Sequence, residues 1–161
     1  MKKESVLRDS VVGHMLTERG LSLAVMEDFT GGLLTATITN APDAAKYFKG
    51  GLIAYSDETL VTYGVDAKLI AKYGGASAEV VQAMAEAARL RLGAAIGVGV
   101  TGSDEPSEIE RRPFSVVYIG IDDGKSKRAI TDYFPWDRAW VKRRVVTAAL
   151  FELRKTLATS G

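Results

Sequence analysis

The chain has 161 residues, of which 47% are hydrophobic and 25% charged, with 21 Lys and Arg against 20 Asp and Glu. This composition is typical of a folded globular protein, and the length favours a single domain over residues 1–161. Balanced charge gives no general attraction to nucleic acid, so we expect no specific nucleic-acid partner. The chain has no Cys and one His. We therefore exclude disulfides, thiolate metal sites and Cys nucleophiles, and expect no bound metal or cofactor.

No apolar run reaches the roughly 20 residues that a membrane-spanning helix needs. The first residues, Met1 to Arg8, are charged and lack the apolar centre of a signal peptide. We therefore expect a cytoplasmic protein that does not contact a membrane.

The first half of the chain predicts two short strands set among helices, from apolar spacing and from turn and capping residues. In chain order these elements are a helix over Glu4 to Arg19, a strand over Leu21 to Met26, a helix over Leu33 to Thr39, a strand over Gly50 to Ser56, and two short helices that Asp57 and Asp66 are expected to cap.

The second half predicts one long helix, three strands and a final helix. In chain order these elements are a helix over Ser77 to Leu92, a buried strand over Ala94 to Thr101, a polar loop over Gly102 to Arg112, two hairpin strands over Pro113 to Ile121 and Arg128 to Phe134, and a helix from Asp137 to about Leu157. The order of elements predicts an α/β fold. We expect a three-layer α/β/α sandwich with a mixed, mostly parallel sheet and a C-terminal hairpin.

Ligands of open α/β sheets bind where strands lead into helices at their carboxyl ends. Three segments meet this description: Glu27 to Gly32, Tyr55 to Leu60, and the loop after Thr101. The two glycines of the first segment allow a ligand to approach the backbone, and a helix start offers N–H donors to an anion. A Gly pair before a helix is also a common tight turn, and the segment lacks the Lys and the Gly spacing of a P-loop.

Four blocks of sequence carry a resemblance to a known family. They are Met26 to Gly32 (MEDFTGG), Tyr55 to Leu60 (YSDETL), Gly74 to Ser77 (GGAS) and Phe134 to Lys142 (FPWDRAWVK). In order and spacing, the span from about Leu16 to Leu157 resembles the C-terminal domain family of CinA, the competence/damage-inducible protein. The enzymatic members of that family are nicotinamide mononucleotide deamidases, which are amide hydrolases. The resemblance also implies a homodimer or higher homo-oligomer.

This chain departs from the family pattern at several site positions. The family's Ser nucleophile in the first block is Asp28 here, and its Lys in the second block is Leu60. The Gly-rich family stretch Ser-Gly-x-Ala-Gly-Pro-x-Gly-Gly is reduced to Thr101 to Ser107 (TGSDEPS), and Trp136 replaces a Gly of the last block. We expect the bulk of Trp136 to fill part of the pocket.

The departures at the nucleophile and the Lys position weigh against the family's chemistry. A Ser hydroxyl attacks an amide carbon when a base or a cation helps to remove its proton. Asp28 has no hydroxyl to acylate, and Leu60 cannot stabilise developing negative charge. We therefore predict a family member that has lost amide hydrolysis and retains at most nucleotide or small-ligand binding. Two alternatives stay open: an active amidohydrolase in which Asp28 acts as base on a water molecule, and a structural or interaction module.

The residues expected to contact a ligand are those that this chain keeps in the family blocks. They are Glu27, Thr30, Gly31, Gly32, Tyr55, Ser56, Arg138 and Arg143. Such residues would hold a pyridine nucleotide or another small phosphorylated ligand, with the two arginines near its phosphate. On the same helix, Lys142 and Arg144 are expected to lie on a solvated face. A hard-cation site that joins Asp28 and Asp104 is a further open alternative.

Overall fold

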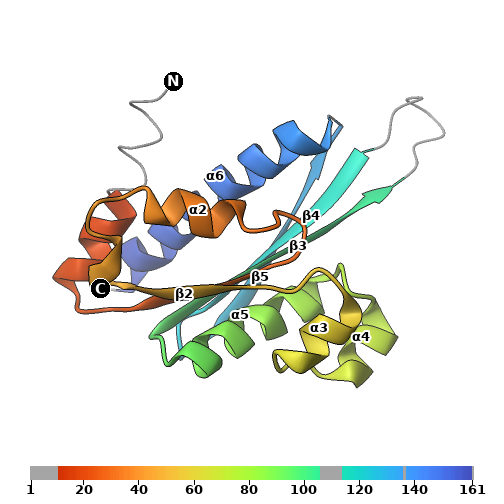
Figure 1. Cartoon of the computed structure of the whole chain (residues 1–161), viewed down its shortest axis with the longest axis horizontal. Helices are drawn as coiled ribbons and strands as arrows, with labels where there is room; N and C mark the ends of the chain where they lie inside the picture. The colour runs from red at the N-terminus through yellow and green to blue at the C-terminus, as the bar shows by residue number, and fades with distance from the viewer. Residues whose placement is uncertain (1–10, 106–113, 136, 161) are drawn as a thin grey trace.

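The computed structural model describes residues 11–105, 114–135 and 137–160 of the chain (Figure 1). Five strands form one sheet in the order β2-β1-β3-β4-β5. Their bounds are β1 Leu23–Glu27, β2 Phe48–Ile53, β3 Ile96–Glu105, β4 Phe114–Asp122 and β5 Lys127–Phe134. Helices cover both faces of the sheet, which confirms the predicted three-layer α/β/α sandwich.

The sheet is mixed, as predicted, with four of its five strands running in one direction and β4 running in the other. Strand β1 pairs in parallel with β2 and with β3, whereas β3 pairs antiparallel with β4 and β4 antiparallel with β5. Parallel pairing needs a crossover of a dozen or more residues. Only eight residues, 106–113, separate the end of β3 from the start of β4, which is too few for such a crossover.

Two groups of helices form the outer layers (Figure 1). The helix over residues 11–18, α2 and α6 lie on one face of the sheet, and α3, α4 and α5 lie on the other. The bounds are α2 Leu33–Thr39, a short 3₁₀ turn Ala44–Lys46, α3 Asp57–Thr62, α4 Ala67–Tyr73, α5 Ala78–Leu92 and α6 Arg138–Thr159. Within the described ranges, no helix is long and apolar enough to cross a membrane.

Most of the predicted helix caps are confirmed. The side chains of Asp66, Ser77 and Asp137 each accept a hydrogen bond from a main-chain N–H two or three residues further on. The prediction for α3 was wrong by one residue. Ser56, which has an extended backbone, is the N-cap, and Asp57 is already the first residue of the helix.

Strand β3 is longer than predicted. Its antiparallel pairing with β4 continues through Gly102 to Glu105, where the sequence predicted the start of a polar loop. Polar side chains are compatible with a strand here because hydrogen bonds to β4 satisfy the backbone on that side. The rest of the predicted loop lies outside the described residues. The extra strand length carries Asp104 to the candidate site.

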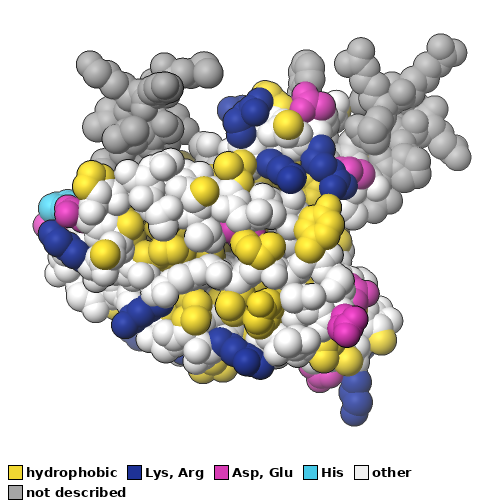
Figure 2. Space-filling view, viewed as in Figure 1, with side chains coloured by type: hydrophobic (Ala, Val, Ile, Leu, Met, Phe, Trp, Pro, Cys, Tyr) yellow, Lys and Arg dark blue, Asp and Glu magenta, His cyan; other side chains and the backbone are white. Residues whose placement is uncertain are grey.

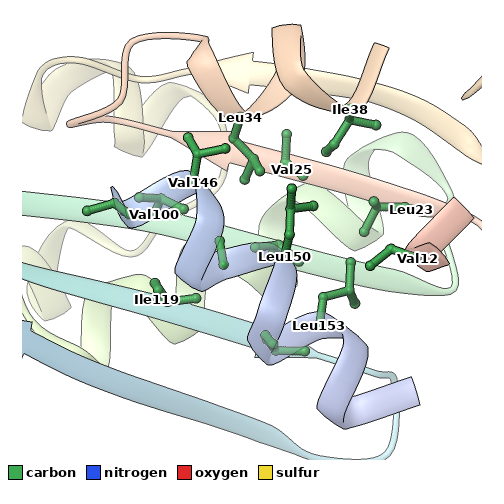
Figure 3. Packing of buried hydrophobic residues seen from close by; sticks show 14 of the residues in the cluster. Val12, Leu23, Val25, Leu34, Ile38, Val100, Ile119, Val146, Leu150 and Leu153 are labelled. Carbon is green, nitrogen blue, oxygen red and sulfur yellow. The ribbon is translucent and has the colours of Figure 1, made fainter. Parts of the chain in front are cut away.

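Each face of the sheet has its own apolar core. On one face Val25, Val100 and Ile119 pack against Val146 and Leu150 of α6 (Figure 3). On the other face Ala24 and Met26 pack with residues of α5 such as Val81 and Met84. All five residues of β1 are buried, as expected for a central strand that is covered on both faces.

Candidate functional site

The candidate site lies where the carboxyl ends of β1 and β3 meet the connection that precedes α3 and the N-terminal end of α6. The N–H of Asp28 donates to the carbonyl of Val100 at 3.0 Å, which extends the pairing of β1 and β3 by one residue. Figure 2 shows Lys and Arg side chains gathered over the N-terminal end of α6. The outline of the molecule is hollowed between this group and the lobe formed by α3 and α4.

Asp28, which stands at the family's nucleophile position, is half-buried and hydrogen-bonded. Its Oδ2 accepts from the hydroxyl of Thr101, a fully buried residue of β3, at 2.9 Å. Burial raises the pKa of the Asp28 carboxyl above its ordinary value, and the negative charge of Asp57 acts in the same direction. The Thr101 hydrogen bond and the charge of Arg138 oppose this rise of the pKa without cancelling it.

Leu60 provides no cation to this carboxylate. It is 1% exposed and belongs to the core beneath α5. A Cβ added at Gly75 would lie 3.9 Å from Leu60 Cδ1 and 2.6 Å from the Asp57 carboxylate. At the position where the resemblance implies a Lys, the chain therefore has the apolar core side chain of Leu60. The carboxylate of Asp57 lies near it.

Glu27 is buried, and its carboxylate is fully engaged within the fold. Oε1 accepts from the Thr30 hydroxyl at 2.6 Å and from the N–H of Leu34 at 2.7 Å. Oε2 accepts from Thr35 twice, from its N–H at 2.9 Å and from its hydroxyl at 2.7 Å. Leu34 and Thr35 carry two of the N–H groups that a helix leaves free at its start. The anion that these donors of α2 bind is thus the protein's own carboxylate.

This network gives the Thr30-Gly31-Gly32 segment a clear local role. Gly31 and Gly32 have φ of 60° and 103°, values that favour glycine. With Thr30 bonded to Glu27, the two glycines form the turn that joins β1 to α2. The tight-turn alternative given above for the Gly pair therefore accounts for both glycines, and the same network gives Glu27 and Thr30 a structural role.

Arg138 and Tyr55, both expected at the site, contact each other. Arg138 Nη1 donates to the Tyr55 hydroxyl at 3.0 Å, and the guanidinium lies over the ring of Phe29 at 5.3 Å from its centroid. The Nε and Nη2 groups donate to Oδ2 of Asp104, Nε at 2.9 Å. The hydroxyl of Ser115 donates to the other oxygen, Oδ1, at 2.8 Å.

These contacts keep the ion pair charged. Partial burial of Asp104 is outweighed by the Ser115 and Arg138 hydrogen bonds, so the pKa of the Asp104 carboxyl lies below its ordinary value. The hydrogen bonds from Arg138 to Asp104 and Tyr55 raise the pKa of the guanidinium. Near neutral pH the site therefore holds a charged Arg138 whose chief partner is a carboxylate of the same chain.

The remaining expected residues lie apart from this cluster. Ser56 Oγ accepts from the N–H of Thr59 at 3.2 Å as the cap of α3. Arg143 is exposed, and five residues of helix place it on a different face of α6 from Arg138. Lys142, for which we predicted a solvated face, is half-buried instead, and its Nζ lies 3.8 Å from where a Cβ of Gly31 would be. Trp136, expected to fill the pocket, lies outside the described residues.

The structure also bears on the hard-cation site that would join Asp28 and Asp104. Among the residues it describes, no group of three or more His, Asp and Glu is placed to hold a metal ion. Both oxygens of Asp104 already have partners, Arg138 and Ser115. Asp28 and Asp104 are therefore bound to different groups.

Four residues at the site were not predicted to be there: Thr101, Asp104 as the partner of Arg138, Ser115 and Lys142. For Thr101 a signal existed, because a hydroxyl at the end of a buried strand next to the strand of Asp28 falls at the same sheet edge. For Lys142 the signal was its spacing of four residues from Arg138, which puts both on one helix face. Ser115 required the antiparallel register of β3 and β4, which the sequence did not specify.

Two hollows of the surface lie away from the candidate site. One of about 660 Å³ runs along α4 and α5, and one of about 540 Å³ lies between the helix over 11–18 and residues 41–47. Neither is lined by Asp28, Tyr55 or Arg138.

Comparison with known proteins agrees with the resemblance seen in the sequence blocks. Residues 7–157 match the family model of the CinA C-terminal domain. A protein of Moorella thermoacetica, named as competence-damage inducible, is 38% identical over 151 residues, which are 92% of this chain and 36% of that protein. A CinA-like protein of Frankia casuarinae is 37% identical over 153 residues, 93% of this chain and 35% of that protein.

The chain therefore spans about a third of the length of these curated relatives. Among solved structures, the competence damage-inducible protein A of Klebsiella pneumoniae superposes with a TM-score of 0.88 at 26% identity, covering 96% of this chain and 98% of that one. Family model, sequence and fold agree over nearly all of the chain, which belongs to the CinA C-terminal domain family.

Proposed function

We propose that this chain binds a small ligand at the carboxyl ends of β1 and β3 and does not hydrolyse amides by the Ser chemistry of its family. One observation carries the proposal. The residue at the nucleophile position, Asp28, is a half-buried carboxylate bonded to Thr101, and the residue at the Lys position, Leu60, is part of the core.

The chemistry of acyl transfer supports this proposal. Attack of the Asp28 carboxylate on an amide carbon would form an anhydride, a high-energy product with no advantage over the starting amide. Loss of the nucleophile costs a factor on the order of 10⁴–10⁶ in rate in well-studied hydrolases. Loss of a group that stabilises the oxyanion costs about 10²–10³. Either loss alone would leave little activity.

The polar groups near Asp28 suit a small phosphorylated ligand such as a pyridine nucleotide. Tyr55 offers a hydroxyl, while Arg138 and Lys142 offer two cations four residues apart on α6. Cations of this kind bind phosphate oxygens through charge-assisted hydrogen bonds. The aromatic ring of Phe29, under the guanidinium, supplies an apolar surface at the same place.

Two measurements on the purified chain test the proposal. Ammonia release from nicotinamide mononucleotide should not exceed that of buffer, and calorimetric titration with the same nucleotide should show saturable binding that Tyr55→Phe and Lys142→Gln weaken. Thr62→Val, on the exposed side of α3, is the matched control and should bind as the unmodified chain does. Robust ammonia release that Asp28→Ala abolishes would overturn the proposal, and so would the absence of any binding.

A second function is favoured by one feature of Asp28. A carboxyl group whose pKa is raised by burial is suited to general-base work. Asp28 would take a proton from a water molecule, the hydroxide would attack the amide carbon, and the proton would leave with the departing ammonia. This reaction predicts a rate that rises with pH through the pKa of Asp28 and is lost in Asp28→Asn. Binding without turnover excludes it.

A further inference from the structure

Asp104 is a departure from the family pattern that the structure connects directly to Arg138. Where the family stretch reads Ser-Gly-x-Ala-Gly-Pro, this chain reads Thr101 to Pro106, so that Asp104 stands at the family's Ala. The residue lies near the end of β3 and reaches the N-terminal end of α6. A methyl group at this position could not form any of the polar contacts that Asp104 makes.

The contact between Asp104 and Arg138 has the form in which an arginine binds an anionic ligand. Two N–H groups of the guanidinium, on Nε and Nη2, donate to the carboxylate. This edge of the guanidinium is the one that commonly binds phosphate and carboxylate groups in a bidentate manner. A third N–H, on Nη1, donates to Tyr55. Asp104 therefore uses the Nε and Nη2 donors on one edge of the guanidinium, and its negative charge lies beside any anion that would bind the same arginine.

Asp104 is also held in place on its other side. Its Oδ1 accepts the hydroxyl of Ser115, a buried residue of β4 that pairs with Asp104 across the two strands. The carboxylate is thus anchored to the sheet, while Arg138 begins the neighbouring helix. Its lowered pKa keeps it ionised near neutral pH. The positive charge of Arg138 is consequently neutralised by a carboxylate that is fixed to the sheet, and not by an anion from solution.

We propose that Asp104 is a specificity-determining residue that occupies Arg138 in place of a ligand phosphate and so selects against anionic ligands. This inference rests on the proposed function, because it concerns the same site. It predicts that a phosphorylated nucleotide binds this site more weakly than it would without Asp104.

The test measures the binding of inorganic phosphate by calorimetry at pH 7.5 and low ionic strength. The unmodified chain should bind phosphate weakly, and Asp104→Asn should bind it about tenfold more tightly. The reason is that one negative charge within about 4 Å of a bound anion weakens binding by a factor of that order. Asp104→Ala, which restores the family residue, should show the same gain. If one of the two Asp104 variants folds poorly, the other still tests the proposal.

Two further variants complete the design. Asp132→Asn removes an exposed carboxylate of β5 that accepts a hydrogen bond from the N–H of Tyr133, and it should raise phosphate affinity less than either Asp104 variant does, because Asp132 is not the partner of Arg138. Arg138→Gln added to Asp104→Asn should remove the gain. The proposal is overturned if neither Asp104 variant gains affinity, or if the gain survives in the double variant.

Titration with nicotinamide riboside separates this inference from the proposed function. This ligand has the pyridine and the ribose but no phosphate. Its affinity therefore measures binding to the site when Arg138 has no ligand anion to contact. Binding of the riboside with no phosphate gain in Asp104→Asn overturns the role of Asp104 alone. If Asp104→Asn gains phosphate affinity but the chain does not bind the riboside, the role of Asp104 is supported. The pyridine ligand of the proposed function is then overturned.

Discussion

Glu27 and Thr35 are joined by two hydrogen bonds that end on the same carboxylate oxygen, one from the main-chain N–H at 2.9 Å and one from the hydroxyl at 2.7 Å. The first residue ends β1 and the second lies in the first turn of α2. The buried carboxylate thus fixes the angle at which α2 leaves the sheet. It also holds the intervening segment, which contains Asp28, beside Val100 and Thr101 in the middle of β3.

Replacing Glu27 with Gln should destabilise the fold by about 1–3 kcal/mol. The amide oxygen of Gln can replace one carboxylate oxygen, but its NH₂ group would face the N–H and the hydroxyl of Thr35. The hydroxyl can turn and accept from the NH₂ group, whereas the N–H is left without an acceptor, which costs about 1–3 kcal/mol. Urea unfolding followed by circular dichroism measures the loss as a lower midpoint at unchanged slope.

The matched control for Glu27→Gln is Glu18→Gln. Glu18 is exposed and forms an ion pair with exposed His14, at 3.2 Å. Its replacement should change stability by less than about 0.5 kcal/mol. Equal losses in the two variants would show that the hydrogen bonds of Glu27 do not stabilise the fold beyond what any surface Glu contributes.

The pKa of Asp28 should respond in opposite directions to two nearby substitutions. Thr101→Val removes the hydrogen bond that favours the ionised form, so the pKa of Asp28 should rise further. Asp57→Asn removes a neighbouring negative charge, so the pKa should fall. Carbon-detected NMR titration of the Asp28 carboxyl measures both. A pKa that moves in the same direction in the two variants contradicts this account of the site.

Asp28→Asn should stabilise the protein increasingly as the pH rises from acid to neutral. Because the pKa of Asp28 is raised on folding, mainly by burial, the native state binds more protons than the unfolded state between the two pKa values. The unmodified chain therefore loses stability as pH rises from the unfolded pKa of about 3.9 to the folded pKa. Asn cannot ionise, and its amide oxygen can still accept from Thr101.

Thermal unfolding of the two proteins from pH 3 to pH 8 measures this difference. The advantage of Asp28→Asn should be smallest below pH 4 and should reach a plateau above the folded pKa. A difference that is constant over the whole range, or that shrinks towards neutral pH, would show that burial of Asp28 does not raise its pKa.

The sequence predicted the layers, the strands and most helix caps, because these depend on local pattern. The helix over Leu33 to Thr39 has the predicted bounds, and Asp66 and Ser77 cap as expected. The length of β3 was not predicted, because its residues from Gly102 to Glu105 are polar and become a strand only by pairing with β4. Local pattern does not show such pairing.

The site was less predictable than the fold for a physical reason. Motif matching places Arg138 and Tyr55 near a ligand, but it does not show which donors the protein itself uses. The Glu27 carboxylate bonds to the start of α2, and Asp104 bonds to Arg138. Both contacts join residues that lie seven or more positions apart in the sequence, so they are specified by tertiary geometry.

The glycines of β3 and β4 beneath α5 provide a prediction about packing. A Cβ added at Gly120 would overlap the carbonyl oxygen of Val81, and one added at Gly99 would lie 2.6 Å from the same oxygen. Such contacts are with helix backbone, which cannot move without displacing α5 from the sheet. Gly120→Ala should therefore destabilise the protein by about 3 kcal/mol, at the upper end of the cost of overpacking.

Thr131→Ala is the control for Gly120→Ala, because Thr131 lies on the neighbouring strand β5 and is exposed. Its replacement should cost less than about 1 kcal/mol. Urea unfolding compares the two variants at one pH. If Gly120→Ala is as stable as the unmodified chain, the helix does not lie against these glycines as closely as described, because a methyl group would then fit between α5 and the sheet.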